Sequence, residues 1–227
     1  MSNPEFAIAE VFPGKLNALV KNIMKQTRVD DPNEAVRLVN SGEWVISKMV
    51  RIWREENGVV YFNEPFVSDG TTGQAWVDRL IKKGRRVSDN AKKRLLLPDF
   101  KPTNGVITKI AVLKGELFSD EDRITKNIRT KAHAGSFTNG KKLFDPNPEI
   151  ACMIRERCSD EEIEAMGLWG IIGMHKPIKD SDGGLDLLGA FRGGDGSWLY
   201  TYYGKPDYRW NRDHGFAFAV AQVGPQN

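Results

Sequence analysis

The chain has 227 residues, of which 40% are hydrophobic and 28% are charged, as is typical of a globular protein with a sizeable core. Its 33 basic and 30 acidic residues leave a formal net charge of +3, and this balance argues against a nucleic-acid partner. No stretch reaches the roughly 20 apolar residues of a membrane span, and the N-terminus lacks the pattern of a secretory signal. We therefore expect a cytoplasmic protein.

The first fifty residues predict a helical segment. Apolar residues recur at helical spacing in Pro13–Arg28, with lysines on the opposite face. Asp31 and Pro32 then form a typical helix start, and the short helix that follows should run through Leu38. Residues 1–50 could serve as an oligomerisation or docking element, or they could pack on the main domain. The sequence leaves both open.

Helices and strands alternate irregularly in the first half of residues 51–227. We expect a polar turn at Arg54–Asn57, a strand at Gly58–Phe62, a loop at Ser68–Gly73, helices at Gln74–Lys83 and Asn90–Leu97, and a strand at Val106–Leu113. The helix signals are the potential cap Ser88, the stop residues Gly84 and Pro98, and apolar positions on one face. The strand signals are β-branched and aromatic runs.

The second half is expected to continue in the same way. The predicted elements are a helix opening at Ser119–Asp122, a mobile loop at Ala132–Asn147, helices starting at Pro148 and at Ser159, a strand at Leu168–Met174, and two final strands near Trp198 and at Phe216–Val223. Helices cluster in the middle of the chain while strands are dispersed along it. This distribution predicts an α+β fold.

Signals for metal or catalytic chemistry are weak. Cys152 and Cys158 are too few for a disulfide framework and should lie on different sides of one helix. The three histidines lack metal-ligand spacing, and no nucleotide-binding or nucleophile motif is present. Asp180-Ser181-Asp182-Gly183 is similar to the opening of a calcium loop but lacks the closing Glu, which favours an ordinary turn. We therefore predict no metal and no cofactor.

The C-terminal tail, residues 188–223, has a different composition. A glycine-rich turn at 192–197 is followed by a run of Tyr, Trp, Asp, Arg, Asn and His without periodicity, and then by an apolar strand. Tyrosine and tryptophan offer large, rigid contact areas, and Asp, Arg and Asn add adaptable hydrogen bonds. The alternative is that the aromatic residues, Trp198 and Trp210 above all, pack the core. For the tyrosines, a contact surface is the better interpretation.

The order Arg192-Gly193-Gly194, Ser197-Trp198 and Gly215-Phe216 resembles the RGGSW and GFR pattern that ends the formylglycine-generating-enzyme type of C-type lectin fold. The chain departs from it by inserting Asp195-Gly196 and by placing Ala217 where the family often has Arg. The resemblance implies a C-type-lectin-like domain at 51–227, with a mixed, mostly antiparallel sheet and packed helices. It also implies that Trp198 fills the core and that the last strand pairs with the first.

Two kinds of protein carry this ending. In the enzyme, copper-binding cysteines lie between the two motifs, whereas Trp198–Gly215 contains no cysteine here. In the variable proteins of diversity-generating retroelements, adenine-directed mutagenesis rewrites the same interval. Upstream stretches such as NEAVRLVNSGEW and PEIACMIRERCSDEEIEAMGLW also resemble hypothetical proteins of candidate-phylum bacteria, in which such retroelements are frequent.

The resemblance to variable proteins implies a non-enzymatic ligand-binding protein, displayed on a surface or virion or kept inside the cell, whose partner is an unknown protein or surface ligand. The implied variable, ligand-binding residues are Tyr200, Tyr202, Tyr203, Asp207, Tyr208, Arg209, Asn211, Asp213 and His214. The implied framework residues are Arg192, Gly193, Gly194, Trp198, Trp210, Gly215 and Phe216. Two alternatives are an oxidoreductase of the formylglycine-generating type and a nucleic-acid-associated protein that uses the basic stretches Lys82–Arg94 and Lys141-Lys142.

Overall fold

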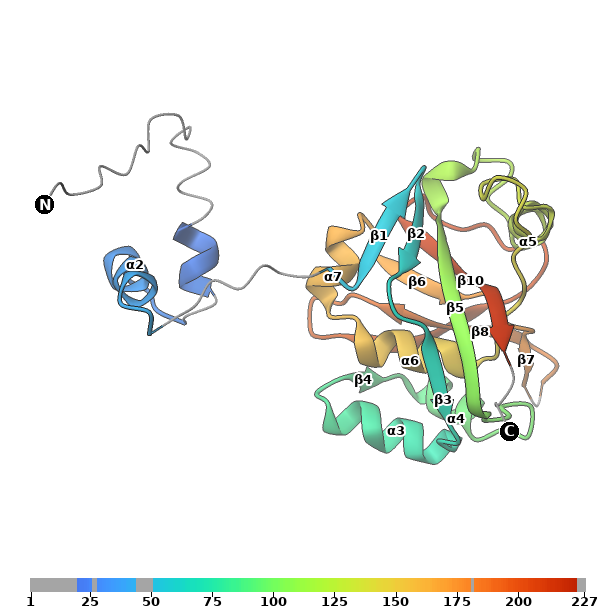
Figure 1. The fold of residues 1–227 in the computed structure, drawn as a ribbon. Coiled ribbons are helices and arrows are strands. Elements are labelled where there is room, and N and C mark those ends of the chain that lie inside the picture. The colour runs from blue at the N-terminus through green and yellow to red at the C-terminus, as the bar shows by residue number, and fades with distance from the viewer. Residues whose placement is uncertain (1–19, 26–27, 44–50, 181, 224–227) are drawn as a thin grey trace, which may run out of the picture. The chain divides into compact units, whose positions relative to one another are not determined.

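The computed structural model describes residues 20–25, 28–43, 51–180 and 182–223, and the chain divides into two compact units, Met1–Val50 and Arg51–Asn227 (Figure 1). In the first unit, residues 20–25 are helical and helix α2 spans Pro32–Asn40. The Asp31 side chain accepts a hydrogen bond from the Asn33 N–H (3.0 Å), which confirms the predicted helix start. The other residues of the predicted first helix, 13–19 and 26–27, lie outside the described residues.

The second unit contains a ten-stranded mixed sheet whose main path runs β1-β2-β5-β10-β6-β8-β9-β4, with β3 added to β5 and β7 to β8 (Figure 1). Among the described residues, the β10–β6 and β4–β9 pairs are parallel and the other strand pairs are antiparallel. The strands are β1 Trp53–Glu56, β2 Val59–Phe62, β3 Phe66–Asp69, β4 Arg86–Val87, β5 Asn104–Lys114, β6 Gly170–Gly173, β7 Ile178–Lys179, β8 Leu185–Phe191, β9 Trp198–Tyr203 and β10 His214–Val223.

Helices accompany the sheet, and the α+β class is thereby confirmed. They are α3 Gly73–Lys82, α4 Asp89–Leu95, the 3-10 turn η1 Gly115–Leu117, α5 Thr125–Ala134, α6 Glu149–Arg157 and α7 Asp160–Ala165. The predicted caps are present, because Ser88 accepts from the Ala91 N–H and Ser159 forms a capping box with Glu162. Each cap satisfies backbone donors that a helix start would otherwise leave unpaired.

The sheet separates two apolar cores. Side chains alternate along β5, so that Val112 lies in the first core and Leu113 in the second. Helices α3, α4 and α6 contribute to the first core and α5 to the second. Figure 1 shows α3 and α4 at the opposite side of the domain from α5. Covering both faces explains why β6 is buried along its whole length.

The predicted polar turn at Arg54–Asn57 is wrong. Residues 53–56 form β1, which pairs with β2 as a hairpin whose turn is Asn57-Gly58. Both turn residues have positive φ, 53° and 76°, the conformation that an Asn-Gly hairpin turn requires. The polar residues of β1 are exposed at the sheet edge, so their polarity reflects a solvated strand rather than a turn.

Other expected boundaries also shift. Ser119 and Asp122 form a turn, in which the Asp122 N–H donates to the Ser119 hydroxyl (3.2 Å), and α5 begins only at Thr125. This helix extends to Ala134, so the predicted loop at Ala132–Asn147 starts too early. The predicted loop at Ser68–Gly73 overlaps the end of β3, and the strands β4, β7 and β8 have no counterpart among the predicted elements.

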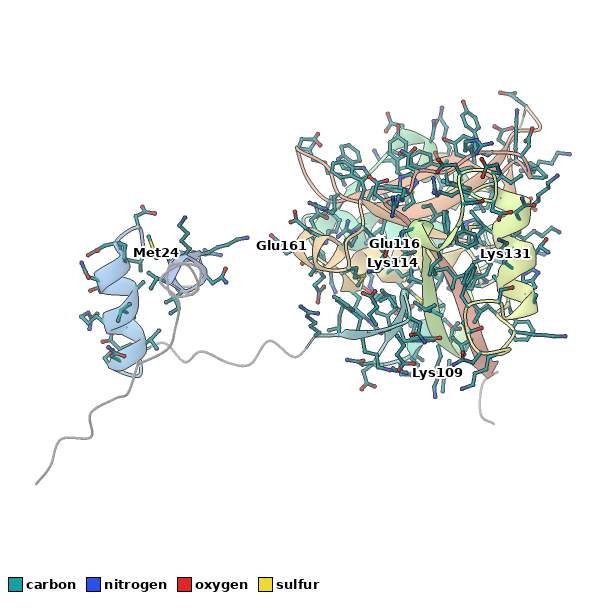
Figure 2. The ribbon with its side chains drawn as sticks, turned by 90° about the horizontal axis from the view of Figure 1, so that it is seen from above. Met24, Lys109, Lys114, Glu116, Lys131 and Glu161 are labelled. Carbon is teal, nitrogen blue, oxygen red and sulfur yellow. The ribbon has the colours of Figure 1, made fainter. Side chains whose placement is uncertain are left out.

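An ion pair joins the C-terminal end of β5 to β1. The Lys114 ammonium lies 2.8 Å from the Glu55 carboxylate of β1 and 3.9 Å from that of Glu116, and Figure 2 shows Lys114 and Glu116 next to each other. Cys152 and Cys158 are buried and do not form a disulfide. Cys152 lies within α6, but Cys158 is the extended residue that follows it, so the two do not lie on one helix as expected. None of the helices described here is long and apolar enough to span a membrane.

His175 is completely buried just after β6. Its Nε2 accepts a hydrogen bond from the Leu188 N–H (2.9 Å), and its Nδ1 lies 2.7 Å from the Lys176 carbonyl oxygen. The ring must therefore be neutral, with its proton on Nδ1. Burial lowers the pKa of His175 from 6.5 to about 4.

This burial predicts an acid-dependent loss of stability. Between pH 6.5 and about 4 the unfolded chain binds a proton that the folded chain does not, so the contribution of His175 is complete above pH 6.5 and lost as the pH falls toward 4. The loss should reach about 3 kcal/mol. Urea unfolding of the wild type and of His175→Gln across this range should show a shallower acid slope in the variant. Equal slopes in the two proteins would contradict the assignment.

Candidate functional site: the aromatic surface of the tail

Strand β9 carries the first group of tail tyrosines. It pairs with β8 along its whole length, with Tyr200 opposite Gly189 and Tyr202 opposite Leu187. Side chains alternate in a strand, so Tyr200 and Tyr202 lie on the face of the second core, whereas Leu199 points into the first. Tyr200 is 44% exposed and Tyr203, at the strand end, is 60% exposed.

Strand β10 lies in the centre of the sheet, between β5 and β6. The expected pairing of the last strand with the first strand of the domain is therefore wrong, because β1 lies at the edge. Since β9 and β10 run in the same direction, the segment 204–213 must return from the end of β9 to the start of β10. We call this segment the crossing segment. It passes beside the second core and brings its side chains near β9.

The crossing segment is fixed by the start of α5. The first N–H groups of that helix, at Thr125 and Lys126, donate to the carbonyls of Tyr208 (3.1 Å) and Pro206 (2.8 Å). No side chain caps α5 at Ile124, so backbone carbonyls of the tail take the place of a cap. The Trp210 indole N–H also donates to the Thr125 hydroxyl (3.0 Å). The helix and the crossing segment therefore hold each other in place.

The tyrosines of β9 and of the crossing segment form one aromatic cluster. Ring centroids lie 5.6 Å apart for Tyr200 and Tyr202, 5.8 Å for Tyr202 and Trp210, and 4.8 Å for Trp210 and Tyr208. The Tyr203 ring lies 5.7 Å from that of Tyr208. These are ordinary distances for stabilising ring contacts. The buried Trp210 is therefore the support on which the outer tyrosines rest.

Two glycines make room for the layer beneath this cluster. A Cβ on Gly170 would lie 2.1 Å from the Phe191 ring, and one on Gly189 would lie 2.5 Å from it. The Phe191 ring consequently covers two glycines on neighbouring strands, and its other contacts include Tyr202 at 4.8 Å. Any side chain at Gly170 or Gly189 would displace Phe191 and, through it, the tyrosines.

Most of the predicted ligand-binding residues are accessible. Tyr202 and Tyr208 are partly buried, whereas Asp207, Arg209, Asn211 and Asp213 of the crossing segment are exposed. Arg209 donates to the Asp120 carbonyl, which ties one of the exposed residues to the turn before α5. His214 is only 3% exposed, so the expectation that it lines an exposed face is wrong. Its position in β10, level with buried Gly170 of β6, places it in the interior.

The predicted framework residues differ in their burial and in the space around them. Trp210 is buried, and a Cβ on Gly215 would lie 2.6 Å from Val112 and 2.7 Å from Leu168. Gly193 is similarly confined, whereas Gly194 has open space around it. Phe216 is fully buried in the second core, and Arg192 bonds to the Leu168 carbonyl (3.1 Å).

Trp198 only partly fills the core, as it packs against the second core without being buried in it. It is partly exposed, its indole N–H donates to Asp195 (3.0 Å), and the Arg86 guanidinium lies 5.3 Å from its ring. The inserted Asp195-Gly196 pair explains this position, since Asp195 also forms an ion pair with Arg86 (2.9 Å). The Trp198 hydrogen bond, and after it the charge of Arg86, hold the pKa of Asp195 below its usual range.

Two hollows flank β9. The first, of about 380 Å³, is lined by Tyr200–Tyr203 and Tyr208, together with residues of α4, of β8 and of the segment between β7 and β8. The second, of about 220 Å³, shares Tyr200 and Tyr202 and adds Trp169 and Trp198. The lining residues that sequence reasoning did not identify are Asn90, Arg94, Thr201, Asp180, Gly184, Asp186, Trp169 and Phe191. They come from segments far apart in the chain, and no local pattern assigns them to a common site.

Charged groups in the first hollow are held by one arginine. Arg94 of α4 pairs through Nε with Asp186 (2.5 Å) and through Nη2 with Asp180 (2.9 Å). Asp180 also accepts from the Asp182 N–H (2.9 Å), so the predicted turn at 180–183 is an Asx turn. Burial raises the pKa of Tyr202 and of Tyr208, so both hydroxyls remain protonated donors at neutral pH.

Within the described part of the chain, no group of three or more His, Cys, Asp or Glu side chains could hold a metal ion. Comparison with known proteins identified no matching family model, no matching curated protein and no matching solved structure. The chemistry of the aromatic surface must therefore be argued from its own geometry.

The space around Gly215 and Gly194 differs, so the same substitution should affect stability at one position and not at the other. Gly215→Ala should destabilise the protein by about 1–3 kcal/mol, because its new methyl group would press on Val112 and Leu168. Gly194→Ala should stay close to the wild type, since nothing lies within 4 Å of the position. Chemical denaturation of both variants measures the difference. Equal stabilities would show that the frame around β10 is looser than the structure indicates.

Proposed function

We propose that the chain is a non-enzymatic ligand-binding protein with a C-type-lectin-like domain, whose C-terminal tail is diversified by a retroelement to present a variable binding surface. The observation that carries the proposal is the gathering of Tyr200, Tyr203 and Tyr208 with the exposed crossing segment on a rigid, buried support. Exposed aromatic clusters on a fixed frame are typical of binding surfaces.

The division between frame and exposed residues supports diversification. Replaceable positions must tolerate many side chains, and Asp207, Arg209, Asn211 and Asp213 are all exposed. Frame positions must not vary, and Trp210, Gly215 and Phe216 are buried. Buried His214 belongs with the frame in this proposal, which narrows the variable set inferred from sequence.

The oxidoreductase alternative has little support in the positions of the thiols. Cysteine chemistry requires an accessible thiolate. Both cysteines are buried, and burial raises the pKa of Cys158 to about 12 and that of Cys152 further still. They also belong to α6 and its C-terminal end, in the first core, whereas Tyr200 and Tyr202 lie on the face of the second core.

The nucleic-acid alternative depends on free cations in Lys82–Arg94. Several of these are already paired, with Lys83 bound to Glu156 (2.8 Å), Arg86 to Asp195 (2.9 Å) and Arg94 to two aspartates. Cations neutralised within the protein release few counterions from a phosphate backbone. Binding to DNA or RNA that weakens steeply with salt would favour this alternative over the proposal.

The central test separates binding from folding. The double variant Tyr200→Ala/Tyr203→Ala removes two exposed rings and should melt within a few degrees of the wild type, whereas Trp210→Ala should lose about 3–5 kcal/mol. Ligands are sought on a glycan array and in a random-peptide display library, and each is measured again with the double variant. Binding should weaken at least about tenfold. A collapse of folding in the double variant, or ligands that bind it unchanged, would contradict the proposal.

Diversification has its own test in the neighbouring DNA. We expect a near-copy of the tail-coding segment that differs mainly at adenines, beside a reverse transcriptase gene. Among sibling sequences, variation should fall on exposed positions such as Tyr203, Asp207 and Asn211 and should spare Trp210 and Gly215. Sequencing of the flanking DNA and of tail amplicons checks both expectations. Uniform variation across exposed and buried positions would oppose diversification without affecting the binding test.

A further inference from the structure

One edge of β9 has no strand partner along half of its length, where Thr201 is 8% and Tyr203 60% exposed. The short strand β4 pairs in parallel with β9 only at Trp198 and Leu199. Among the residues that the structure describes, no strand continues this pairing along Tyr200–Tyr203. After Val87 the chain enters α4, which remains beside β9, and its cap residue Ser88 donates its N–H to the Leu199 carbonyl (3.1 Å).

The direction of the open backbone groups follows from these bonds. The carbonyls of Ser197 and Leu199 point toward β4, where they accept from Arg86 (2.8 Å) and Ser88. Backbone groups of successive residues in a strand point to alternate sides. The N–H and C=O of Thr201 and of Tyr203 therefore point outward, whereas those of Tyr200 and Tyr202 bond to β8.

The first hollow lies along this open edge. Its lining includes four consecutive β9 residues, from Tyr200 to Tyr203, although their side chains belong to both faces of the sheet. A hollow on one face of a strand would be lined only by every second residue. Contact with all four is expected where the hollow opens onto the edge of the strand itself.

Charge indicates what kind of strand fits there. Asp180 and Asp186 outnumber Arg94 among the charged residues that line the hollow. Arg94 occupies Oδ2 of Asp186, and no donor among the described residues bonds to its Oδ1. Asp186 is opposite Tyr203 in the register, so a strand added beyond β9 would lie two strand spacings, roughly 10 Å, from Asp186. Only a long basic side chain crosses that distance. Its path runs over the exposed Tyr203 ring, where it would replace the chain's own Lys205, whose ammonium lies 5.9 Å from the ring centroid.

We propose that the ligand of this surface is an extended polypeptide segment that adds as a strand to the open edge of β9 at Thr201 and Tyr203, and that places a lysine or arginine across Tyr203 toward Asp186. The inference rests on the proposed binding function and specifies its partner class and mode. Main-chain hydrogen bonds would supply affinity that does not depend on the partner's sequence. The tyrosines and Asp186 would select the side chains.

Amide exchange tests the edge directly. Peptides are selected from a random-peptide display library on the full chain, and hydrogen exchange of the protein is followed by NMR with and without the tightest peptide. The Thr201 and Tyr203 amides should exchange at least about tenfold more slowly when the peptide is bound. The Tyr200 and Tyr202 amides, already bonded to β8, serve as the internal control and should change little. Equal protection of all four amides would overturn edge pairing.

Two further tests change the peptide, and the second also compares protein variants. N-methylation of alternate peptide residues should weaken binding at least about tenfold in one register and little in the other, because only one set of amides faces β9. Replacing the peptide's basic residue by norleucine should weaken binding to the wild type but not to Asp186→Asn, whose melting temperature is measured first because Asp186 pairs with Arg94. Asp99→Asn, an exposed aspartate outside the hollow, is the control variant. Peptides without an enriched basic residue, or insensitivity to both N-methyl sets, would overturn the inference.

The same selection keeps the two levels of the proposal apart. Peptides that lose binding to Tyr200→Ala/Tyr203→Ala without protecting Thr201 and Tyr203 would overturn strand addition and leave the binding function supported. If the library yields no such peptide and only ligands from the glycan array bind the double variant more weakly, strand addition would again be overturned and the binding function supported. If no peptide and no glycan binds the double variant more weakly than the wild type, both the binding function and strand addition would be overturned.

Discussion

The central position of β10 is the constraint on which the rest of the tail depends. Its pairing with β5 extends from Gly215 to Val223, and its other side pairs in parallel with β6. A strand that must end in the middle of the sheet cannot follow β9 directly, because β6 and β8 lie between them. The chain has to cross the sheet face instead. The crossing segment and its exposed side chains are a consequence of that topology.

The residues of the crossing segment lack the backbone hydrogen bonds of a sheet strand, and α5 provides other partners for their backbone groups. The carbonyls of Pro206 and Tyr208 accept hydrogen bonds from the otherwise unpaired N–H groups in the first turn of the helix. The backbone N–H of Trp210 donates to the Arg123 carbonyl (2.9 Å). Arg123 is itself buried and bonded to the carbonyls of Gly115 and Phe118 (3.0 Å each). The main chain of the segment is thus satisfied by groups that do not depend on its exposed side chains. Such an arrangement allows those side chains to change without loss of the fold.

Local signals in the sequence were sufficient for elements with their own caps and periodicity, as at Ser88 and Ser159, because these interactions lie within a few residues. The start of α5 was mispredicted because its capping groups are about eighty residues away in the tail. Composition identified the tyrosines of the surface, since their type alone distinguishes them. It could not place His214 inside or add Arg94 and Asp186, because register and crossing topology decide those positions.

Rigidity at the edge of β9 is the remaining physical requirement for tight binding there. Arg94 joins α4 to Asp180 and Asp186, so the helix that forms one wall of the hollow is tied to the strand that forms another. All three side chains are largely buried, where screening by solvent is weak and the pairing is less easily lost than on an open surface. A hollow held open in the free protein spares the ligand the cost of ordering its site. Variation of the exposed tail would then change which side chains are preferred while the edge and its backbone groups stay in place.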